Sequence, residues 1–315
     1  MNTLDEKSKL VSIVLPVHNG ARFLRLSIDS CLQQTYRNIE LIVVDDGSED
    51  NSVDIIKSYD DERIKLIRHE TNRKLPATLN TGFKHTCGVY LTWTSHDNYY
   101  APTAIAEMVH FLEENPHIHF VFTDDYFVDE ANQFLGVVKR GPIERLAAES
   151  CLGGGFLYTR TVYEKVGPYN EQTFLAEDYD YWLRVSASFT LAHLNQPLYY
   201  YRQHPDSLTS RYVGGETIEA AVTVQRQLFG KNLWRNRVLL SQGHLSAASA
   251  FYWSNKRTSA ARNTFWGIAL NPKCLLRRPA QIIVAGLCLG QSGLRILVRL
   301  KHAIRRIAPH SRLLD

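Results

Sequence analysis

The 315-residue sequence has few cysteines and no apolar run before its first predicted strand. The five cysteines are scattered, odd in number and form no C-x-x-C pair: Cys31, Cys87, Cys151, Cys274 and Cys288. This pattern excludes a disulfide framework and a cysteine-based zinc site, and fits a reducing compartment. Because the opening residues M-N-T-L-D-E-K-S-K are mostly polar, we expect no signal peptide.

The charge of the chain is unevenly distributed. Hydrophobic residues make up 44% and charged residues 22%, which is an ordinary globular composition. The formal net charge of +4 conceals a basic end, since 12 Lys or Arg and a single acid lie between Lys256 and Asp315. A basic segment of this kind predicts an anionic partner.

Short apolar runs alternate with helical patterns over the first 122 residues. Strands are predicted at Ser12–Leu15, Leu41–Val44, Ile64–Ile67, Val89–Thr92 and His119–Phe122. Helices are predicted at Arg22–Gln33, Asp50–Ser58, Leu75–His85 and Pro102–Glu114. This alternation predicts βαβ units and therefore an α/β fold with a mostly parallel sheet.

The pattern changes after Asp124. We predict a turn at Asp129–Asn132, a loop or tight backbone site at Gly153–Gly155, a helix at Asp178–Ala187, and strands at Thr190–Leu194 and Leu198–Tyr201. Helices follow at Thr217–Leu228, Asn236–Tyr252, Ser259–Ala269 and from Gln281 onward, with Gln242–Tyr252 antiparallel to Ser259–Ala269. The expected organisation is a domain over 1–210, divided at about residue 102, and a helical region over 211–315.

Polar residues follow the first two strands directly. Asn19 comes after the first strand, and Asp45 and Asp46 end the second. Ligands of open α/β sheets bind outside the carboxyl ends of the strands. Carboxylates there bind base or ribose hydrogens, or a metal that binds phosphate. A turn with a helix cap is the alternative, but two adjacent acids exceed what a cap requires.

Four segments resemble, in order and spacing, the motifs of inverting glycosyltransferases of family 2, which have the GT-A fold. They are V-V-D-D-G-S, Asn72–Gly82, Trp93–Pro102 and Glu177–Arg184, and the resemblance extends to about Ser210. It implies that the backbone around Pro16 and Val17, together with Asn19, Asp45 and Asp46, binds the base and ribose of a nucleotide-sugar.

Asn72–Gly82 resembles the family segment N-x-G-x-x-x-A-R-N-x-G, which lies beside the diphosphate. Asn72 and Asn80 match, whereas Lys74 stands where glycine is usual and Leu79 where arginine is common. The resemblance implies that Asn72, Lys74 and Asn80 contribute to the nucleotide site. The alternative is that the basic residues are merely exposed in a loop.

Trp93–Pro102 aligns with the family's metal motif. Asp97 keeps its last carboxylate, and Ser95 replaces the first. The implied cofactor is Mn²⁺ or Mg²⁺, which needs few protein carboxylates and takes other ligands from phosphate and water. The later segment Y-R-Q-H-P-D-S implies that Arg202 closes over the diphosphate and that His204 is a second metal ligand. The alternative for Asp97 is a helix cap.

Glu177–Arg184 resembles the family element E-D-x-D-x-x-x-R. The implied general base is Asp178, because displacement at an anomeric carbon requires a group that deprotonates the acceptor hydroxyl. Glu177 would orient acceptor or donor. Asp180 and Arg184 are four residues apart and are better explained as an ion pair on the helix surface.

These motifs predict the transfer of a sugar from a nucleotide-sugar, with UDP as the expected nucleotide, to a lipid-linked or cell-surface polysaccharide acceptor. One alternative is a sugar-1-phosphate nucleotidyltransferase, although Pro16–Asn19 lacks its Gly-rich phosphate loop. The other is an inactive sugar-binding or scaffold protein, which the replacement by Ser95 favours and the retained Asp97 and Asp178 oppose. We expect no nucleic-acid partner, and the oligomeric state stays open.

The C-terminal residues have the pattern of an interfacial amphipathic helix. Pro279–Leu294 is uncharged but shorter than the roughly 20 residues that span a bilayer. After it, Leu297, Leu300, Ile304 and Ile307 share one helical face, and Arg295, Arg299, His302 and Arg306 share another. We therefore expect a cytoplasmic protein on the inner face of the cell membrane. The alternative is a helix packed on the domain.

Overall fold

The computed structural model describes residues 8–147, 150–211, 216–229, 233–276, 284 and 287. The chain forms two compact units, Met1–Arg211 and Tyr212–Asp315. Each unit is described by itself.

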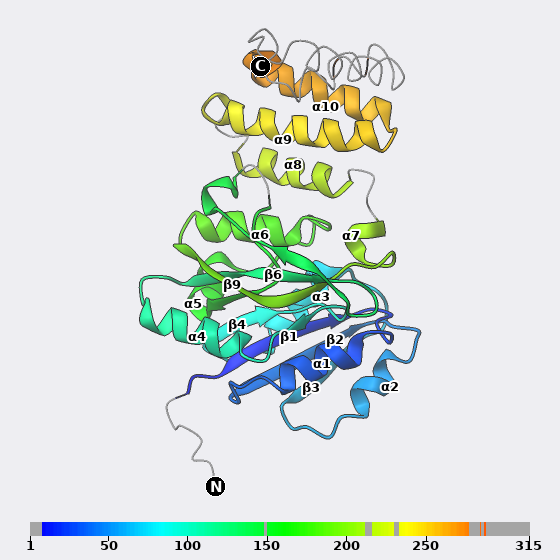
Figure 1. The fold of residues 1–315 in the computed structure, drawn as a ribbon, viewed down its shortest axis with the longest axis vertical. Helices are drawn as coiled ribbons and strands as arrows, with labels where there is room; N and C mark the ends of the chain where they lie inside the picture. The colour runs from blue at the N-terminus through cyan, green and yellow to red at the C-terminus, as the bar shows by residue number, and fades with distance from the viewer. Residues whose placement is uncertain are drawn as a thin grey trace, which may run out of the picture. The chain divides into compact units, whose positions relative to one another are not determined.

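The first unit is built on one nine-stranded sheet (Figure 1). Its strands are β1 (Val11–Val17), β2 (Ile39–Asp46), β3 (Ile64–His69), β4 (Tyr90–Trp93), β5 (Tyr99–Tyr100), β6 (Phe120–Val128), β7 (Phe134–Val138), β8 (Phe156–Thr159) and β9 (Leu191–Arg202). The order is β3-β2-β1-β4-β8-β6-β9-β5, with β7 paired to β6. β1 to β4 are parallel neighbours, as are β6 and β9, whereas β5, β7 and β8 pair antiparallel. The predicted α/β fold is confirmed.

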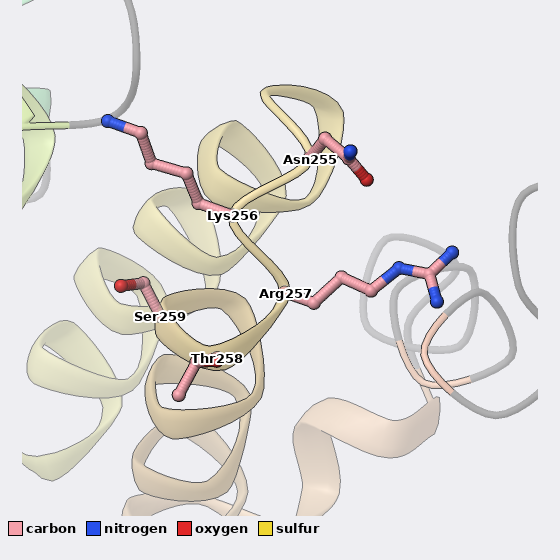
Figure 2. A pocket seen from close by; sticks show the side chains of 5 residues that line it. All are labelled: Asn255, Lys256, Arg257, Thr258 and Ser259. Atoms are coloured by element: carbon pink, nitrogen blue, oxygen red, sulfur yellow. The ribbon is translucent and has the colours of Figure 1, made fainter.

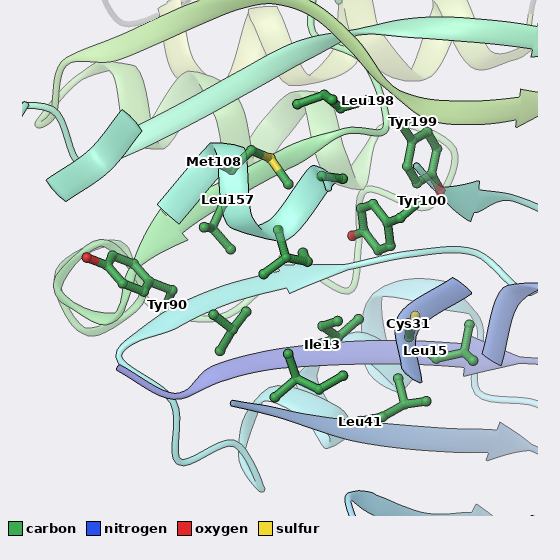
Figure 3. Packing of buried hydrophobic residues seen from close by; sticks show 14 of the residues in the cluster. Ile13, Leu15, Cys31, Leu41, Tyr90, Tyr100, Met108, Leu157, Leu198 and Tyr199 are labelled. Carbon is green, nitrogen blue, oxygen red and sulfur yellow. The ribbon is translucent and has the colours of Figure 1, made fainter. Parts of the chain in front are cut away.

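Helices flank the sheet, and most of them lie where the helical patterns predicted, but those at Arg160–Val166 and Leu208–Arg211 were not predicted. They are α1 (Leu24–Leu32), α2 (Ser52–Lys57), α3 (Leu75–Phe83), α4 (Ala104–Glu114), α5 (Arg160–Val166), α6 (Glu177–Ser186) and α7 (Leu208–Arg211). The main apolar core joins Ile13, Leu15 and Leu41 of the strands to Cys31 of α1 and Met108 of α4 (Figure 3).

The register of the first strands brings their polar ends to one edge. Val17 of β1 pairs with Asp45 of β2, and Asp45 pairs in turn with Arg68 of β3. The polar residues that follow β1 and β2 therefore lie together, as expected for parallel strands that end at the same edge.

Three predicted strands differ from those observed. The strand predicted to end at Phe122 continues as β6 through Asp124 and Asp125 to Val128. The two later predictions form one strand, β9, which pairs with β6 across register shifts between Thr123 and Asp125. The apolar pattern ends at Phe122 because the next positions carry acids, although both acids are buried.

The second unit contains α8 (Glu216–Phe229), α9 (Leu233–Trp253) and α10 (Arg257–Leu270), followed by a short 3₁₀ turn at Pro272–Leu276. Ser241 Oγ donates to the Gly267 carbonyl at 2.7 Å, and His244 Nδ1 lies 2.8 Å from Asn263 Oδ1. Earlier residues of α9 thus meet later residues of α10, which confirms the predicted antiparallel pair. A hollow at the turn between them is lined by Asn255–Ser259 (Figure 2).

Within the described part of the chain, no helix combines the length and apolarity needed to cross a membrane. The predicted amphipathic tail lies outside the described residues, apart from single positions 284 and 287.

Candidate active site

The loops after β1 and β2 are joined by hydrogen bonds. Asn19 has a positive φ of 51°, a conformation that asparagine tolerates better than most residues. Its backbone N–H donates to Ser48 Oγ, and its side-chain oxygen accepts from the Glu49 N–H, both at 2.9 Å. Asp45 is fully buried and accepts from Arg68 Nε at 3.1 Å. The residues proposed for base and ribose, together with Pro16 and Val17 of β1, therefore form one connected edge.

Asp46 organises the next loop. Its carboxylate accepts from the backbone N–H groups of Arg73 and Lys74 at 2.8 and 3.0 Å, and lies 2.7 Å from His69 Nδ1. Asn72 Oδ1 accepts from the same Lys74 N–H at 2.9 Å. Asp46 therefore shapes the loop predicted to meet the diphosphate, and its direct contact with a nucleotide stays a prediction.

The backbone conformation of Lys74 explains why glycine is usual at this position in the family. Its φ of 74° lies in the region that favours glycine. The exposed side chain places its ammonium 5.9 Å from the centre of the Phe174 ring, within cation–π range. A positive charge is thus retained on the loop despite the missing glycine.

The side chain of Asn80 links α3 to the segment before α6 by hydrogen bonds. It is buried, accepts from the Tyr169 N–H at 2.8 Å, and donates to the Tyr169 carbonyl and to Glu171 Oε1 at 2.9 and 3.1 Å. These bonds give its side chain a positioning role. Its predicted contact with a nucleotide is untested.

Asp97 and His204 form the candidate metal site. His204 Nε2 lies 3.0 Å from Asp97 Oδ2. Both Asp97 Oδ1 and His204 Nδ1 are buried, and neither has a hydrogen-bond partner among the described residues. Burial favours the neutral acid, but the hydrogen bond from His204 and the charge of His96 hold the pKa of Asp97 below its usual value.

This pair is not a complete metal cage. Ser95 and His96 lie beside it, with the His96 ring packed on Gly20, where a Cβ would lie 2.6 Å from Cδ2 of the ring. In the part of the chain that the structure describes, no group of three or more His, Cys, Asp or Glu residues could hold a metal. The pair therefore fits a cation that takes its remaining ligands from a diphosphate and water.

Arg202 supports the loop that carries Asp97 of the candidate metal site. Its side chain is buried, and its guanidinium donates to the carbonyls of Asp97, Asp129 and Glu130 at 2.9 to 3.3 Å. The guanidinium also lies 4.4 Å from the centre of the Phe23 ring. As placed, Arg202 fixes the loop that carries Asp97, and its predicted closure over a diphosphate would require these bonds to be exchanged.

An acidic pair begins α6. Glu177 is 5% exposed, and its Oε2 has no hydrogen-bond partner among the described residues. Burial and the neighbouring Asp178 raise the pKa of Glu177 to about 8. Burial also raises the pKa of Asp178, while the Tyr179 N–H, which donates to Oδ1 at 2.6 Å, and the charge of Arg140 oppose that rise.

Asp180 and Arg184 form the predicted pair, with Nε 2.8 Å from Oδ2. Asp180 is buried rather than on the surface, so the predicted surface location was wrong. Arg184 also donates to the carbonyls of Val166 and Pro168, both at 3.0 Å. The pair thus ties α6 to the segment that follows α5.

The sequence analysis missed Asp124, Asp125 and Arg140. The two acids lie on β6 and are fully buried, and Arg140 bonds to both of them. The adjacent acids in F-V-F-T-D-D-Y-F-V are the same signal that drew attention to V-V-D-D-G-S, and could have marked them. Gly153, Gly154 and Gly155 pack tightly against Asp125, Tyr199 and Thr123, which confirms a tight backbone site.

Tyr201 directly precedes Arg202, whose guanidinium bonds to the Asp97 carbonyl. It lies on β9, and its hydroxyl is 3.1 Å from Thr209 Oγ1. Burial raises its pKa, and the charges of Asp97, Arg140 and Asp178 all act on it. Charges from the candidate metal site, from Arg140 and from the start of α6 therefore all influence the ionisation of this tyrosine.

A GT-A-type transferase has this architecture, in which an α/β sheet carries carboxylates after its strands. Structures of similar fold include S. aureus TarS 1–349 in complex with UDP-GlcNAc, with a TM-score of 0.61 and 16% identity, covering 89% of this chain and 92% of that one. Another is the mannosyltransferase PcManGT from Pyrobaculum calidifontis with GDP-Man and Mn²⁺, with a TM-score of 0.56 and 15% identity, covering 97% and 89%. The GT-A fold is confirmed.

Sequence comparison identifies the family. The model "Glycosyl transferase family 2" matches residues 12–167. The putative glycosyltransferase EpsE of Bacillus subtilis is 32% identical, covering 64% of this chain and 76% of that protein. The chain belongs to glycosyltransferase family 2. An uncharacterized glycosyltransferase of Rickettsia prowazekii is 34% identical over 56% of this chain, but the match spans only 58% of that relative's length.

Proposed function

We propose that this chain is a metal-dependent inverting glycosyltransferase that moves a sugar from a UDP-sugar to a lipid-linked or cell-surface polysaccharide acceptor. The observation that carries the proposal is the pair of Asp97 and His204, whose buried Oδ1 and Nδ1 atoms have no hydrogen-bond partner among the described residues. A cation site for the donor diphosphate and a base for the acceptor must lie close together in a direct displacement. Asp97 with His204 is proposed for the first role, and Asp178 for the second.

Asp97 and His204 would hold the cation, Mn²⁺ or Mg²⁺. The unpartnered Asp97 Oδ1 is a hard oxygen donor, which suits both ions, and the imidazole is better suited to Mn²⁺. When bound, the cation would neutralise the charge of the departing diphosphate. PcManGT, of similar fold, was solved with Mn²⁺. The loop of Asn72 and Lys74 would face the same phosphates.

Asp178 would accept the proton of the acceptor hydroxyl. Burial raises its pKa, which makes the carboxylate a stronger base than an exposed aspartate. Glu177, whose pKa is raised to about 8, would carry a proton at neutral pH and donate a hydrogen bond to a sugar oxygen. The two acids of α6 would thus have different roles because their environments differ.

The donor half would be residues 1–102 and the acceptor half 103–210, with 211–315 as a helical region. UDP is proposed as the nucleotide, with Asn19 after β1 and Asp45 and Asp46 at the end of β2 accepting hydrogen bonds from its base and ribose. TarS was solved with UDP-GlcNAc, and PcManGT with GDP-Man. The basic amphipathic tail would bring the enzyme to the inner face of an anionic membrane, where lipid-linked acceptors lie.

A product assay tests this proposal. The full chain is incubated with Mn²⁺ and either a panel of UDP-, GDP- and dTDP-sugars or, in a parallel series, sugar-1-phosphates with nucleoside triphosphates. Nucleoside diphosphate and pyrophosphate are measured separately. A transferase releases nucleoside diphosphate. Release of pyrophosphate from a sugar-1-phosphate and a nucleoside triphosphate would instead identify a nucleotidyltransferase, and a scaffold protein would release neither. Release from GDP-sugars alone would overturn the assignment of UDP.

A further inference from the structure

Lys74 has a backbone conformation that is almost restricted to glycine. Its φ of 74° and ψ of 159° lie in a region that any side chain makes unfavourable. A residue stays in such a conformation only where the surrounding contacts hold it, and such residues are most frequent at active sites and ligand clamps. The contacts that hold Lys74 therefore bear on the function of its loop.

Hydrogen bonds hold the backbone of Lys74 on both sides. Its N–H donates to Asp46 Oδ2 at 3.0 Å and to Asn72 Oδ1 at 2.9 Å. Its carbonyl accepts from the N–H and the hydroxyl of Thr78, at 3.1 and 2.9 Å. The other oxygen of Asp46 accepts from the Arg73 N–H at 2.8 Å. The orientation of the Asp46 carboxylate therefore fixes two successive peptide groups of the loop.

His69 of β3 fixes the orientation of Asp46. His69 Nδ1 lies 2.7 Å from Asp46 Oδ1, and the two side chains are only 8% and 4% exposed. An ionised carboxylate only accepts hydrogen bonds, so the imidazole donates from Nδ1. Nε2, on the opposite side of the ring, lies 3.0 Å from Thr81 Oγ1 of α3. The imidazole is thus held at both nitrogens, between Asp46 and α3.

The loop that these contacts hold carries a positive charge. The Lys74 side chain is exposed, and its ammonium lies 5.9 Å from the centre of the Phe174 ring. Glycine at position 74 would relieve the backbone but would remove the ammonium. The nearby Leu79, which stands where arginine is common in the family, supplies no charge. The chain therefore keeps a cation in this loop at the expense of a strained backbone.

We propose that His69 is a positioning residue of the donor site. It orients Asp46, which holds the loop so that the Lys74 ammonium binds the phosphates of the nucleotide. The inference rests on the proposed function, in which this loop lies beside the donor diphosphate. Lys74 supplies the charge-assisted hydrogen bond to phosphate that Leu79 does not provide.

Amide hydrogen exchange tests the role of His69 without any ligand. Exchange of the Arg73 and Lys74 amides, which both bond to Asp46, is followed by NMR in the full-length protein. We expect His69→Leu to accelerate both by about tenfold, because the carboxylate loses the donor that orients it. His69→Asn should restore slow exchange, since its amide nitrogen is as many bonds from Cα as Nδ1.

The matched control is His110→Leu, which removes an exposed histidine of α4 that lies 3.2 Å from the Glu114 carboxylate. It should leave both amides unchanged. If His69→Leu fails to fold, His69→Gln replaces it, because its amide reaches the position of Nε2 and not that of Nδ1. Exchange as slow as in the wild type in the folded Leu or Gln variant would overturn the inference.

Binding of UDP and of uridine separates loss of the ammonium from general damage to the site. The Kd of each is measured with Mn²⁺ for wild type, His69→Leu, Lys74→Gly and the double variant. We expect each single variant to weaken UDP binding by about tenfold and to leave uridine, which has no phosphate, unchanged. The double variant should bind UDP as Lys74→Gly does, because His69 acts through Lys74. Equal losses for UDP and uridine, or additive losses in the double variant, would overturn the inference.

The thermal stability of the same variants tests the strain. Lys74→Gly should raise the Tm of the first unit by about 2–4 °C, whereas Lys74→Gln, which loses only the charge, should not. A Tm that does not rise in Lys74→Gly contradicts a strained, held loop. If the wild type does not bind UDP, the proposed nucleotide is wrong, and amide exchange and Tm still decide whether His69 holds the loop.

Discussion

His204 Nε2 lies 3.0 Å from Asp97 Oδ2, although 107 residues separate the two in sequence. Asp97 follows β4 and His204 follows β9, so the pairing of β5 with β9 brings the two loops together. The Phe23 ring packs on the His204 imidazole with its centre 5.0 Å away. The candidate metal site is therefore assembled from three separate parts of the chain.

Replacement of Asp97 by alanine should abolish metal-dependent turnover. The cation would lose its charged ligand, and the diphosphate would lose its counter-ion. Nucleoside diphosphate release is measured with Mn²⁺, with Mg²⁺ and with EDTA, for wild type and Asp97→Ala. The control is Asp54→Asn, an exposed acid of α2. Full activity of the wild type in EDTA would contradict the metal assignment.

Asp178→Asn should reduce turnover by about 10²–10⁴-fold, the usual contribution of a general base. Asparagine keeps the size of the side chain but cannot accept the proton. Donor binding, measured by calorimetry with the nucleoside diphosphate, should be retained. Asp180→Asn is the matched control on the same helix and should affect stability more than turnover. Near wild-type turnover of Asp178→Asn would exclude this residue as the base.

Glu177 should make stability depend on pH. Its pKa is about 8 in the folded state, against an ordinary 4.5, so the folded protein binds the extra proton between these values. The protonated Glu177 therefore contributes to the free energy of unfolding, on the order of a few kcal/mol. This contribution is fully present below pH 4.5 and is lost as the pH rises through 8.

The variant Glu177→Gln cannot titrate, so its Tm relative to wild type should rise between pH 5 and pH 8.5. The exposed Glu164→Gln serves as the control and should show a constant difference. Thermal unfolding at several pH values measures both. The assignment of a raised pKa to Glu177 fails if the two variants behave alike.

Asn80→Ala should destabilise the first unit by about 1–3 kcal/mol, because it leaves the buried Tyr169 N–H without its acceptor. Urea unfolding measures the change. Asn72→Ala is the control, since Asn72 is exposed and its side-chain oxygen bonds to the Lys74 N–H within the same loop. Equal stability of the two variants would show that the hydrogen bonds between Asn80 and Tyr169 do not stabilise this unit.

Deletion of residues 281–315 should release the protein from anionic vesicles and leave transfer to a soluble acceptor largely intact. Each Lys or Arg near an anionic surface contributes about 1 kcal/mol, and salt weakens the attraction. Co-sedimentation with phosphatidylserine vesicles at low and high salt compares the full-length and truncated chains. Equal sedimentation of both would favour a tail that packs on protein.

The sequence alone determined the parallel strands of the first half of the sheet and the polar residues at their ends, but not β5, β7 or β8. Apolar runs with the period of buried strands located β1 to β4, and helical periodicity located α1 to α4, because both patterns are local. Asp45 was found because an acid at the end of a buried apolar run is visible without knowing what lies opposite, whereas Asp97 was found through the resemblance of its segment to the family's metal motif. The acids of β6 were missed because the same local rule treats an acid as the end of a strand.

Only the tertiary structure decided which side chains meet. The Asp97–His204 pair and the Asp125–Arg140 pair depend on strand order and register, which hydrophobic periodicity does not specify. Asp46 and Asn80 also acquire their contacts from the tertiary structure. The sequence predicted that both bind a nucleotide, whereas in the fold both hydrogen-bond to other segments of the chain. A carboxylate costs free energy when it is buried without a partner. The contacts that the fold supplies therefore determine whether each acid organises a loop, holds an arginine or stays available for a ligand.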